Sequence, residues 1–262
     1  MDPSFDSKYL LTACADANAR LFELTTGKLL ARMPHNGSVR AVTWGTGNSL
    51  FATASDPFTS RDKGIVSIFD FPREEELIPS GNNKEEVLHA PSKEIFVDDL
   101  NKVTCLGWTI ANEFIIAGFD SGLMVKYDVE TGKEVLRRTD IHHERVNRIN
   151  FNKDKTLFIT ASSDKTAKLI DPVTLQVIKV YKTPAPVNGA VISPTHPHVL
   201  VGGGQEAMKV TVTSGSQGKF ETRLFHMLYE EEFGRVKGHF GPINALAIHP
   251  FGKSYASGSE DG

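Results

Sequence analysis

The sequence is poor in cysteine and has no long apolar run. Only two of its 262 residues are cysteine, Cys14 and Cys105, which excludes a disulfide-stabilised scaffold and a cysteine-ligated zinc site. No apolar segment approaches the roughly 20 residues that a membrane-spanning helix needs. Asp2 and Asp6 precede the first short apolar run, where a secretory signal peptide has basic residues. We therefore expect a soluble cytoplasmic protein.

An excess of positive charge is also missing. The chain has 29 Lys and Arg against 32 Asp and Glu, a net charge of −3, which excludes the basic field of a nucleic-acid coat protein. Hydrophobic residues make up 40% and charged residues 23% of the chain, as in ordinary folded proteins, so wholesale disorder is excluded.

What the sequence does contain is a repeat. A six-residue pattern of apolar positions occurs five times, and its copies start 64, 43, 41 and 56 residues apart. Two of these intervals match the roughly 40–45-residue period of a four-stranded propeller blade, and the two longer ones indicate insertions. The copies are Val39–Trp44, Val103–Trp108, Val146–Phe151, Val187–Ile192 and Ile243–Ile248.

Two further apolar runs follow most copies of the pattern. The second run ends in small or hydroxyl residues and then aspartate, as in Leu157–Asp164, and a third run such as Ile65–Asp70 is rich in β-branched and aromatic residues. Gly27 and Gly132 lie at matching turns, where glycine supplies the positive φ of a hairpin. The pattern predicts an all-β fold of short antiparallel strands.

The chain begins and ends inside a repeat. Tyr9–Asp16 is predicted as a second strand whose first strand is missing, and the sequence stops just after another second strand, Ser254–Asp261. We expect one propeller domain over residues 1–262, incomplete at both ends and open, with about five to six blades and unpaired edges. The predicted blades are a partial one at 1–34, four that start near residues 35, 99, 142 and 183, and a partial last one at 239–262. A fragment or an incomplete gene model of a longer protein would have this form.

Three histidines, His35, His142 and His239, each stand four residues before a first strand. An aspartate follows each after 21 or 22 residues, and Thr160 and Ser257 follow two of them after 18. A histidine, a hydroxyl and an aspartate at this spacing can share one buried hydrogen-bond network within a blade, so we expect His142 and His239 to be largely buried. The predicted structural residues are His35, Asp56, Asp120, His142, Thr160, Asp164, His239, Ser257 and Asp261. Because the pattern recurs with the repeat, we interpret it as structural rather than as a hydrolase triad of His142, Asp164 and Ser257.

Two other motifs are better explained as turns. Gly202-x-Gly204-x-x-Ala207 follows a predicted strand, but another strand pattern comes next, and a dinucleotide site needs a helix there. His196-Pro197-His198 offers two nitrogens without a third ligand that the sequence identifies. We therefore predict no catalytic residue, no metal site and no cofactor.

Two insertions differ in character. Residues 71–101 are polar and acidic and are typical of a long surface connection. Residues 209–237 carry aromatic side chains around the acidic run Glu230–Glu232. This segment is a strand with a long inter-blade loop, a partner-facing element with aromatic anchors and a charged rim, or both. The candidate partner-facing residues are Phe225, Tyr229, Glu230, Glu231, Glu232 and Phe233.

The repeats resemble the WD40 repeat. Gly238-His239 corresponds to its Gly-His pair, and Phe69-Asp70, Tyr127-Asp128 and Ile170-Asp171 stand in the place of Trp-Asp. The sequence departs from the pattern as well, because no repeat keeps the tryptophan. Asp99 and Thr183 occupy two of the positions where histidine is expected, so the networks are partial.

Three segments, 202–208, 218–220 and 230–244, are similar to the family of subunit I of eukaryotic translation initiation factor 3, and the similarity extends over essentially the whole chain. The resemblance implies a seven-bladed propeller, of which this chain lacks the first blade, part of the second and the end of the last. It also implies a non-catalytic cytoplasmic scaffold that binds the scaffold subunit b and the RNA-binding subunit g. Through that complex the family takes part in mRNA recruitment on the small ribosomal subunit, with no membrane and no small-molecule substrate.

A second class of function remains open from the repeats alone. A WD-repeat adaptor for receptor-kinase signalling shares the general pattern, but the block at 202–244 favours the initiation factor. An enzyme on a propeller is a third class, and no paired carboxylates, nucleophile elbow, phosphate-binding loop or metal cluster supports it.

Overall fold

The computed structural model describes residues 1–57, 63–71, 86–87, 90–97, 101–204 and 220–261. Within these ranges the chain is almost entirely β-strand, and the one helix is the short 3-10 helix η1, Thr46–Asn48. The predicted all-β fold class is therefore confirmed. Asp99, most of the insertion 71–101 and the first part of the insertion 209–237 lie outside the described residues.

The strands group into two compact units, one of Met1–Phe119 with Val125–Arg137 and one of Asp120–Met124 with Arg138–Gly262. The first unit contains three sheets, A, B and C. Two residues at strand ends of sheet C, Met124 and Arg138, are assigned to the second unit. Sheet A consists of β1 (Asp2–Pro3), β2 (Tyr9–Ala13), β3 (Asn18–Glu23), β4 (Leu29–Pro34) and β8 (Glu86–Val87). Sheet B consists of β5 (Val39–Trp44), β6 (Leu50–Ser55), β7 (Gly64–Asp70) and β9 (Lys93–Val97). Sheet C consists of β10 (Val103–Trp108), β11 (Phe114–Phe119), β12 (Met124–Asp128) and β13 (Glu134–Arg138).

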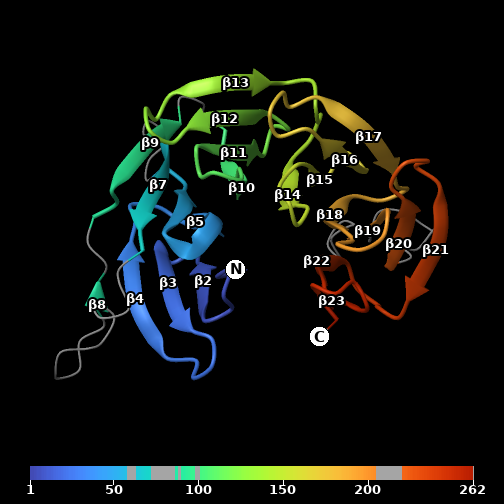
Figure 1. Ribbon diagram of the computed structural model, residues 1–262, viewed down its shortest axis with the longest axis horizontal. Coiled ribbons are helices and arrows are strands. Elements are labelled where there is room, and N and C mark those ends of the chain that lie inside the picture. The colour runs from blue at the N-terminus through green and yellow to red at the C-terminus, as the bar shows by residue number, and fades with distance from the viewer. Residues whose placement is uncertain (58–62, 72–85, 88–89, 98–100, 205–219, 262) are drawn as a thin grey trace, which may run out of the picture. The chain divides into compact units, whose positions relative to one another are not determined.

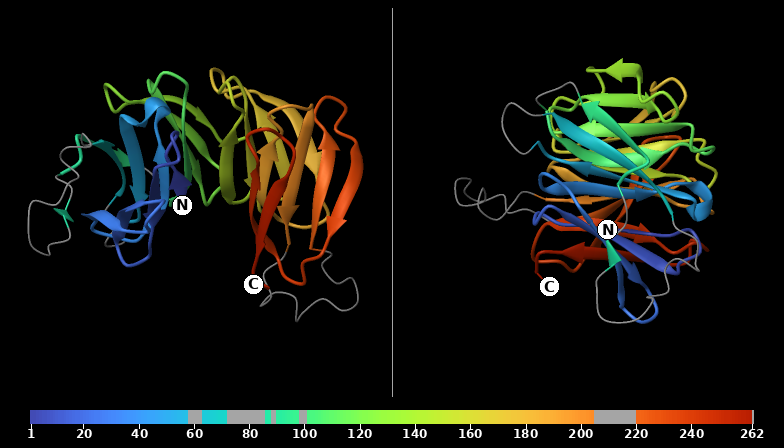
Figure 2. Two further views of the ribbon diagram at one scale, coloured as in Figure 1. Left: turned by 60° about the horizontal axis from the view of Figure 1, so that its bottom comes forward. Right: turned by 90° about the vertical axis from the view of Figure 1, so that its left-hand side faces the viewer.

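The second unit contains the other three sheets (Figure 1). Sheet D consists of β14 (Val146–Phe151), β15 (Phe158–Ser162), β16 (Thr166–Ile170) and β17 (Val177–Lys182). Sheet E consists of β18 (Val187–Ile192), β19 (His198–Gly203), β20 (Glu221–His226) and β21 (Glu232–Lys237). Sheet F consists of β22 (Ile243–Ile248) and β23 (Tyr255–Ser259). Figure 2 shows from two further sides how successive strands of a sheet run side by side as hairpins.

The five copies of the sequence pattern are the strands β5, β10, β14, β18 and β22, with the predicted bounds. Each pairs antiparallel with the next strand along the chain, and each register shifts near the start of the first strand, for example between Val146 and Arg148 in sheet D and between Val187 and Gly189 in sheet E. Such a bulge adds one residue to one strand and increases its local twist. The sequence repeat is therefore a structural repeat down to its irregularities.

The prediction that the N-terminal repeat lacks its first strand is wrong in detail. Asp2 and Pro3 form the two-residue strand β1, which pairs antiparallel with β2. The Asp2 carboxylate accepts a hydrogen bond from the Trp44 backbone N–H at 2.8 Å, and the Asp2 carbonyl accepts one from the Trp44 indole at 3.1 Å. A strand of two residues has no alternating pattern, so only its partners reveal it.

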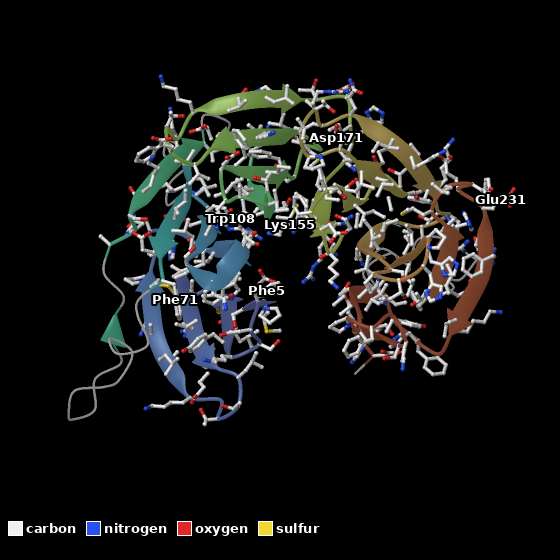
Figure 3. All side chains as sticks on the ribbon, viewed as in Figure 1. Phe5, Phe71, Trp108, Lys155, Asp171 and Glu231 are labelled. Carbon is white, nitrogen blue, oxygen red and sulfur yellow. The ribbon has the colours of Figure 1, made fainter. Side chains whose placement is uncertain are left out.

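The hydrophobic core lies between neighbouring sheets within each unit. In the first unit Phe51 stacks on Phe69 with ring centroids 5.0 Å apart, within a cluster that joins sheets A and B. The indole of Trp108, labelled in Figure 3, donates to the Thr43 carbonyl at 3.2 Å and so ties sheet C to sheet B. In the second unit Tyr181 of sheet D packs against a phenylalanine of sheet E. Each buried apolar side chain of this size stabilises the fold by about 1.5–3 kcal/mol, so packing between sheets holds each unit together.

Candidate functional site

Sheet D holds a complete network of a histidine, a hydroxyl and an aspartate. His142 precedes β14, Thr160 lies in β15 and Asp164 lies in the turn between β15 and β16. The His142 Nε2 atom is 2.7 Å from Thr160 Oγ1, and its Nδ1 atom is 2.8 Å from Asp164 Oδ2. A second hydroxyl, Thr166 Oγ1, donates to the other oxygen of Asp164 at 2.6 Å. We place the imidazole proton on Nδ1, because an ionised carboxylate can only accept.

Burial decides the charges of this network. It lowers the pKa of His142, although Asp164 beside the ring works in the opposite direction. Burial also opposes ionisation of Asp164, but the hydrogen bonds from His142 and Thr166 outweigh it and hold the pKa of that carboxyl well below its usual range. At neutral pH the network therefore consists of a neutral imidazole and an ionised carboxylate.

This arrangement is unsuited to catalysis. His142 is 1% exposed and Thr160 is fully buried, so no substrate can reach either group from solvent. The structure also separates the third member of the hypothetical triad, because Ser257 is bonded to His239 in sheet F. What the network does is satisfy buried polar atoms and join the segment before β14 to the turn after β15.

Sheet F repeats the same arrangement in a more open form. His239 Nε2 is 2.8 Å from Ser257 Oγ, and His239 Nδ1 is 3.1 Å from Asp261 Oδ1. The Phe240 backbone N–H and the Ser259 hydroxyl lower the pKa of Asp261 to about 2. His239 is less buried than His142, because 27% of its side chain is exposed and none of that of His142 is. The physical reason is that the described part of sheet F has two strands, whereas a third strand covers the network in sheet D.

Sheet B brings together a different pair. His35 Nε2 is 2.7 Å from Thr53 Oγ1, and His35 Nδ1 donates to the Met33 carbonyl at 2.9 Å. Burial lowers the pKa of His35. Thr53 is not among the predicted residues, yet it follows His35 by the same 18 positions that separate His142 from Thr160. That spacing is the signal that would have found it.

The predicted pairing of His35 with Asp56 is not what the structure has. Asp56 instead accepts from Arg40 Nε at 2.8 Å and lies 3.9 Å from the ammonium of Lys102. Asp56 follows Thr53 by three residues, whereas the corresponding turn in sheet D has four. The shorter turn aims the carboxylate away from the imidazole.

Sheets C and E have no histidine at this position. In sheet C, Asp120 is exposed in the turn after β11, and the position expected for histidine is Asp99, outside the described residues. In sheet E the position is Thr183, whose hydroxyl donates to the Ala185 carbonyl at 2.7 Å. The residue 18 positions after Thr183 is Val201, so the hydroxyl partner is replaced as well.

The aromatic candidates for a partner-facing surface divide into buried and exposed side chains. Phe225 is wrong as a surface anchor, because it packs against Tyr181 in the core between sheets D and E. Successive side chains of β20 point to opposite faces of sheet E, and Phe225 lies on the face that packs in the core. Tyr229 is 71% exposed and stacks on His226, and Phe233 is 53% exposed and packs on His198.

The three acidic candidates also differ. Glu231 is exposed and lies on the outer side of sheet E, as Figure 3 shows. Glu230 lies 3.4 Å from the ammonium of Lys179. Glu232 accepts from Arg223 at 2.9 Å and also from Arg235, so it belongs to an ion-pair network within sheet E. Of the three, Glu231 is the exposed carboxylate for which no ion pair is found among the described residues.

Across the described ranges, His, Cys, Asp and Glu side chains form no group of three that could hold a metal ion. Nor does any helix of the described residues have the length and apolar character to cross a membrane.

The sheets repeat along the chain, and in sheets B, D and F a histidine four residues before the first strand contacts a hydroxyl of the second strand. These features define a WD-repeat protein of the β-propeller class. The EIF3I family model matches residues 1–262. "Eukaryotic translation initiation factor 3 subunit I" of Homo sapiens is 43% identical over all of this chain and 77% of its own length. The proteins of the same name from Mus musculus and Bombyx mori are 44% and 43% identical, over 77% and 76% of their lengths. The chain therefore belongs to the EIF3I family, and the resemblance derived from the sequence is confirmed.

Proposed function

We propose that this chain is a non-catalytic scaffold subunit of the eukaryotic translation initiation factor 3 complex in the cytoplasm. The observation that carries the proposal is the family match over residues 1–262, together with relatives that are named as subunit I of that factor. The polar networks support a role without chemistry, because they recur from sheet to sheet and the most complete one is closed to solvent.

The partners in this proposal are the scaffold subunit b and the RNA-binding subunit g, with the small ribosomal subunit reached through the complex. A repeat of rigid sheets supports this role, because it presents many loops and strand edges on which extended segments or helices can bind. Tyr229 and Phe233 are exposed aromatic side chains of the kind that anchor protein interfaces, and Glu231 supplies a charge beside them.

Affinity purification of the intact chain from cells, followed by mass spectrometry, tests the proposal. We expect other subunits of initiation factor 3 to co-purify. Capture of receptor-kinase components instead, or of no initiation-factor subunit by a chain with an intact circular dichroism spectrum, would overturn it.

A pair of charge-reversal variants sharpens the test. Glu231→Lys changes an exposed charge and leaves the internal ion pairs intact, whereas the neighbouring Glu232→Lys breaks them. If the rim contacts a partner, Glu231→Lys should slow association and change its salt dependence without shifting the melting temperature. Glu232→Lys is the matched control for an effect that acts through folding.

A further inference from the structure

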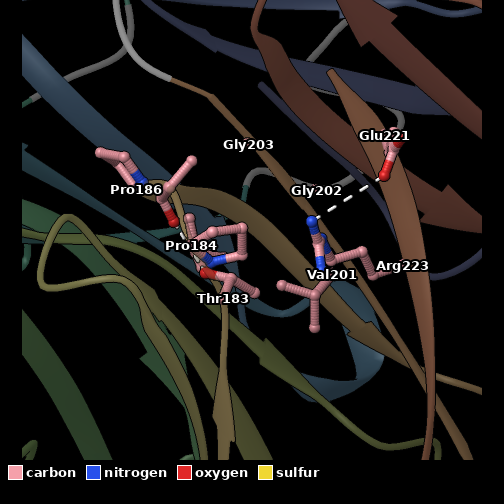
Figure 4. A pocket seen from close by; sticks show the side chains of 10 residues that line it. Thr183, Pro184, Pro186, Val201, Gly202, Gly203, Glu221 and Arg223 are labelled. Atoms are coloured by element: carbon pink, nitrogen blue, oxygen red, sulfur yellow. Dashed lines mark hydrogen bonds and ion pairs between the residues drawn. The ribbon is translucent and has the colours of Figure 1, made fainter. Parts of the chain in front are cut away.

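Sheet E contains a small pocket next to Thr183. Its volume is about 20 Å³, and it is open on one side. Figure 4 shows Thr183 and the prolines that follow it on one wall, and Val201, Arg223 and Glu221 on the other. Neither the family match nor the histidine networks account for this pocket.

Strand registers show what the pocket corresponds to in sheet D. Thr160 pairs with Lys168 in sheet D, as Val201 pairs with Arg223 in sheet E. Thr166 pairs with Lys182, as Glu221 pairs with Lys237. Thr183 stands four residues before its first strand, as His142 does. The pocket therefore occupies the position that the His142 imidazole fills in sheet D, and it is open because threonine is shorter than histidine.

Glu221 is a buried carboxylate in the wall of this pocket. Its side chain is 2% exposed, and within the described part of the chain neither of its oxygens has a hydrogen bond. Three cations surround it at longer distances: Arg235 NH1 at 3.6 Å, Lys237 Nζ at 3.7 Å and Arg223 NH2 at 3.8 Å.

The two arginines donate to a different carboxylate. Arg223 NH1 and Arg235 Nε are both directed at Glu232. Glu221 thus has charge compensation without a hydrogen bond. A buried acceptor without a donor destabilises the fold, and more so when the acceptor is charged. The carboxylate is consequently a strong acceptor that lacks a donor.

Charge and size together define what the pocket accepts. Three cations already lie 3.6–3.8 Å from Glu221, so they repel a further cation, and an anion in the pocket would lie beside the Glu221 carboxylate. About 10–15 Å³ is enough for one water-sized group, and the pocket is only slightly larger. We propose that this pocket binds one neutral hydroxyl group, which donates to Glu221 where sheet D uses an imidazole.

Two sources can supply such a hydroxyl: a water molecule, or a serine, threonine or tyrosine side chain of a bound partner. A crystal structure of the free chain distinguishes them. Bound water predicts an oxygen within about 2.6–3.2 Å of a Glu221 carboxylate oxygen, and a partner side chain predicts that this position is filled only in the purified complex.

Solution NMR provides the matched comparison. We expect nuclear Overhauser contacts between water and the Val201 methyl groups in the free chain or, for a partner hydroxyl, between partner protons and the same methyl groups in the complex. Thr183→His fills the pocket and should abolish these contacts while sheet E stays folded. Glu221→Leu removes the acceptor, and because apolar cavities stay dry it should abolish them too.

The proposal is overturned if Thr183→His keeps the contacts, or if the pocket is dry in the free chain and in the complex. It is also overturned if Glu221 is found hydrogen-bonded directly to Arg223 or Lys237.

Discussion

Sheets D and E are built on the same frame but differ in what lies inside it. Both have four antiparallel strands and a bulge at the same position of the first strand. Sheet D closes its turn with the buried network of His142, Thr160 and Asp164, whereas sheet E has Thr183, Val201 and a carboxylate without a donor. The network is therefore not needed to form a blade. Strand pairing and the core that the two sheets share determine the topology, and the network adds local stability.

The largest expected effect in this comparison is that of His142→Ala. It leaves Thr160 and the ionised Asp164 buried without their partner, so we expect a loss of about 3 kcal/mol in the free energy of unfolding. Urea unfolding followed by circular dichroism measures the loss, and hydrogen exchange of the β15 amides shows where it occurs. Thr183→Ala is the matched control in sheet E and should cost less than about 1 kcal/mol. Equal losses would mean that the network contributes nothing specific to sheet D.

A smaller effect is expected for His239→Ala in sheet F. The same two hydrogen bonds are lost, but the side chain is 27% exposed, so water can replace the imidazole. We expect a loss of about 1 kcal/mol, measured by the same unfolding experiment. A loss as large as that of His142→Ala would contradict the view that burial sets the strength of these networks.

Acidification should destabilise the sheets to different extents, depending on the histidines that they contain. Burial lowers the pKa values of His35 and His142 in the folded chain below the ordinary 6.5. The unfolded chain therefore takes up these protons first, and stability should fall as the pH decreases from 6.5 toward the folded values. Below pH 3.8 the low pKa of Asp164 adds a further loss. Between pH 7 and pH 5, the protection of backbone amides against hydrogen exchange should weaken in β6 and β15, with β19 as the control. Uniform weakening across all three strands would count against this account.

The smallest effect is expected for Asp56→Asn in sheet B. Its partners Arg40 and Lys102 are half exposed, and ion pairs of this kind contribute about 0.5 kcal/mol. Thr53→Val is the informative companion, because it removes the hydroxyl that His35 contacts and should cost about 1–2 kcal/mol. Thermal melts of the two variants rank them. A larger loss for Asp56→Asn than for Thr53→Val would contradict the view that the contact of His35 with Thr53 matters more than the exposed ion pairs of Asp56.

Much of the architecture could be read from the residues because it depends on local patterns. The apolar spacing of Val146–Phe151 and its four relatives requires one buried and one outward face, which gives a strand and its bounds. The recurrence of His142 and His239 with a hydroxyl 18 residues later already implies a contact within one sheet. The prediction for Phe225 is wrong because local patterns do not show which face of a strand is buried. An aromatic residue next to acidic ones can be an interface anchor or part of the core, and only the pairing of its strand decides between them.

By itself, then, the sequence determined the fold class, the positions of the repeated strands, the family and the identity of the network histidines, because each follows from spacing along the chain. Only the tertiary structure decided how those side chains are used. A turn one residue shorter directs Asp56 to Arg40 and away from His35, the strands that cover a network set its burial, and the loss of one imidazole in sheet E leaves Glu221 facing a pocket. These outcomes depend on distances between segments far apart in the chain, and burial and hydrogen bonding are properties of that packing rather than of any one residue.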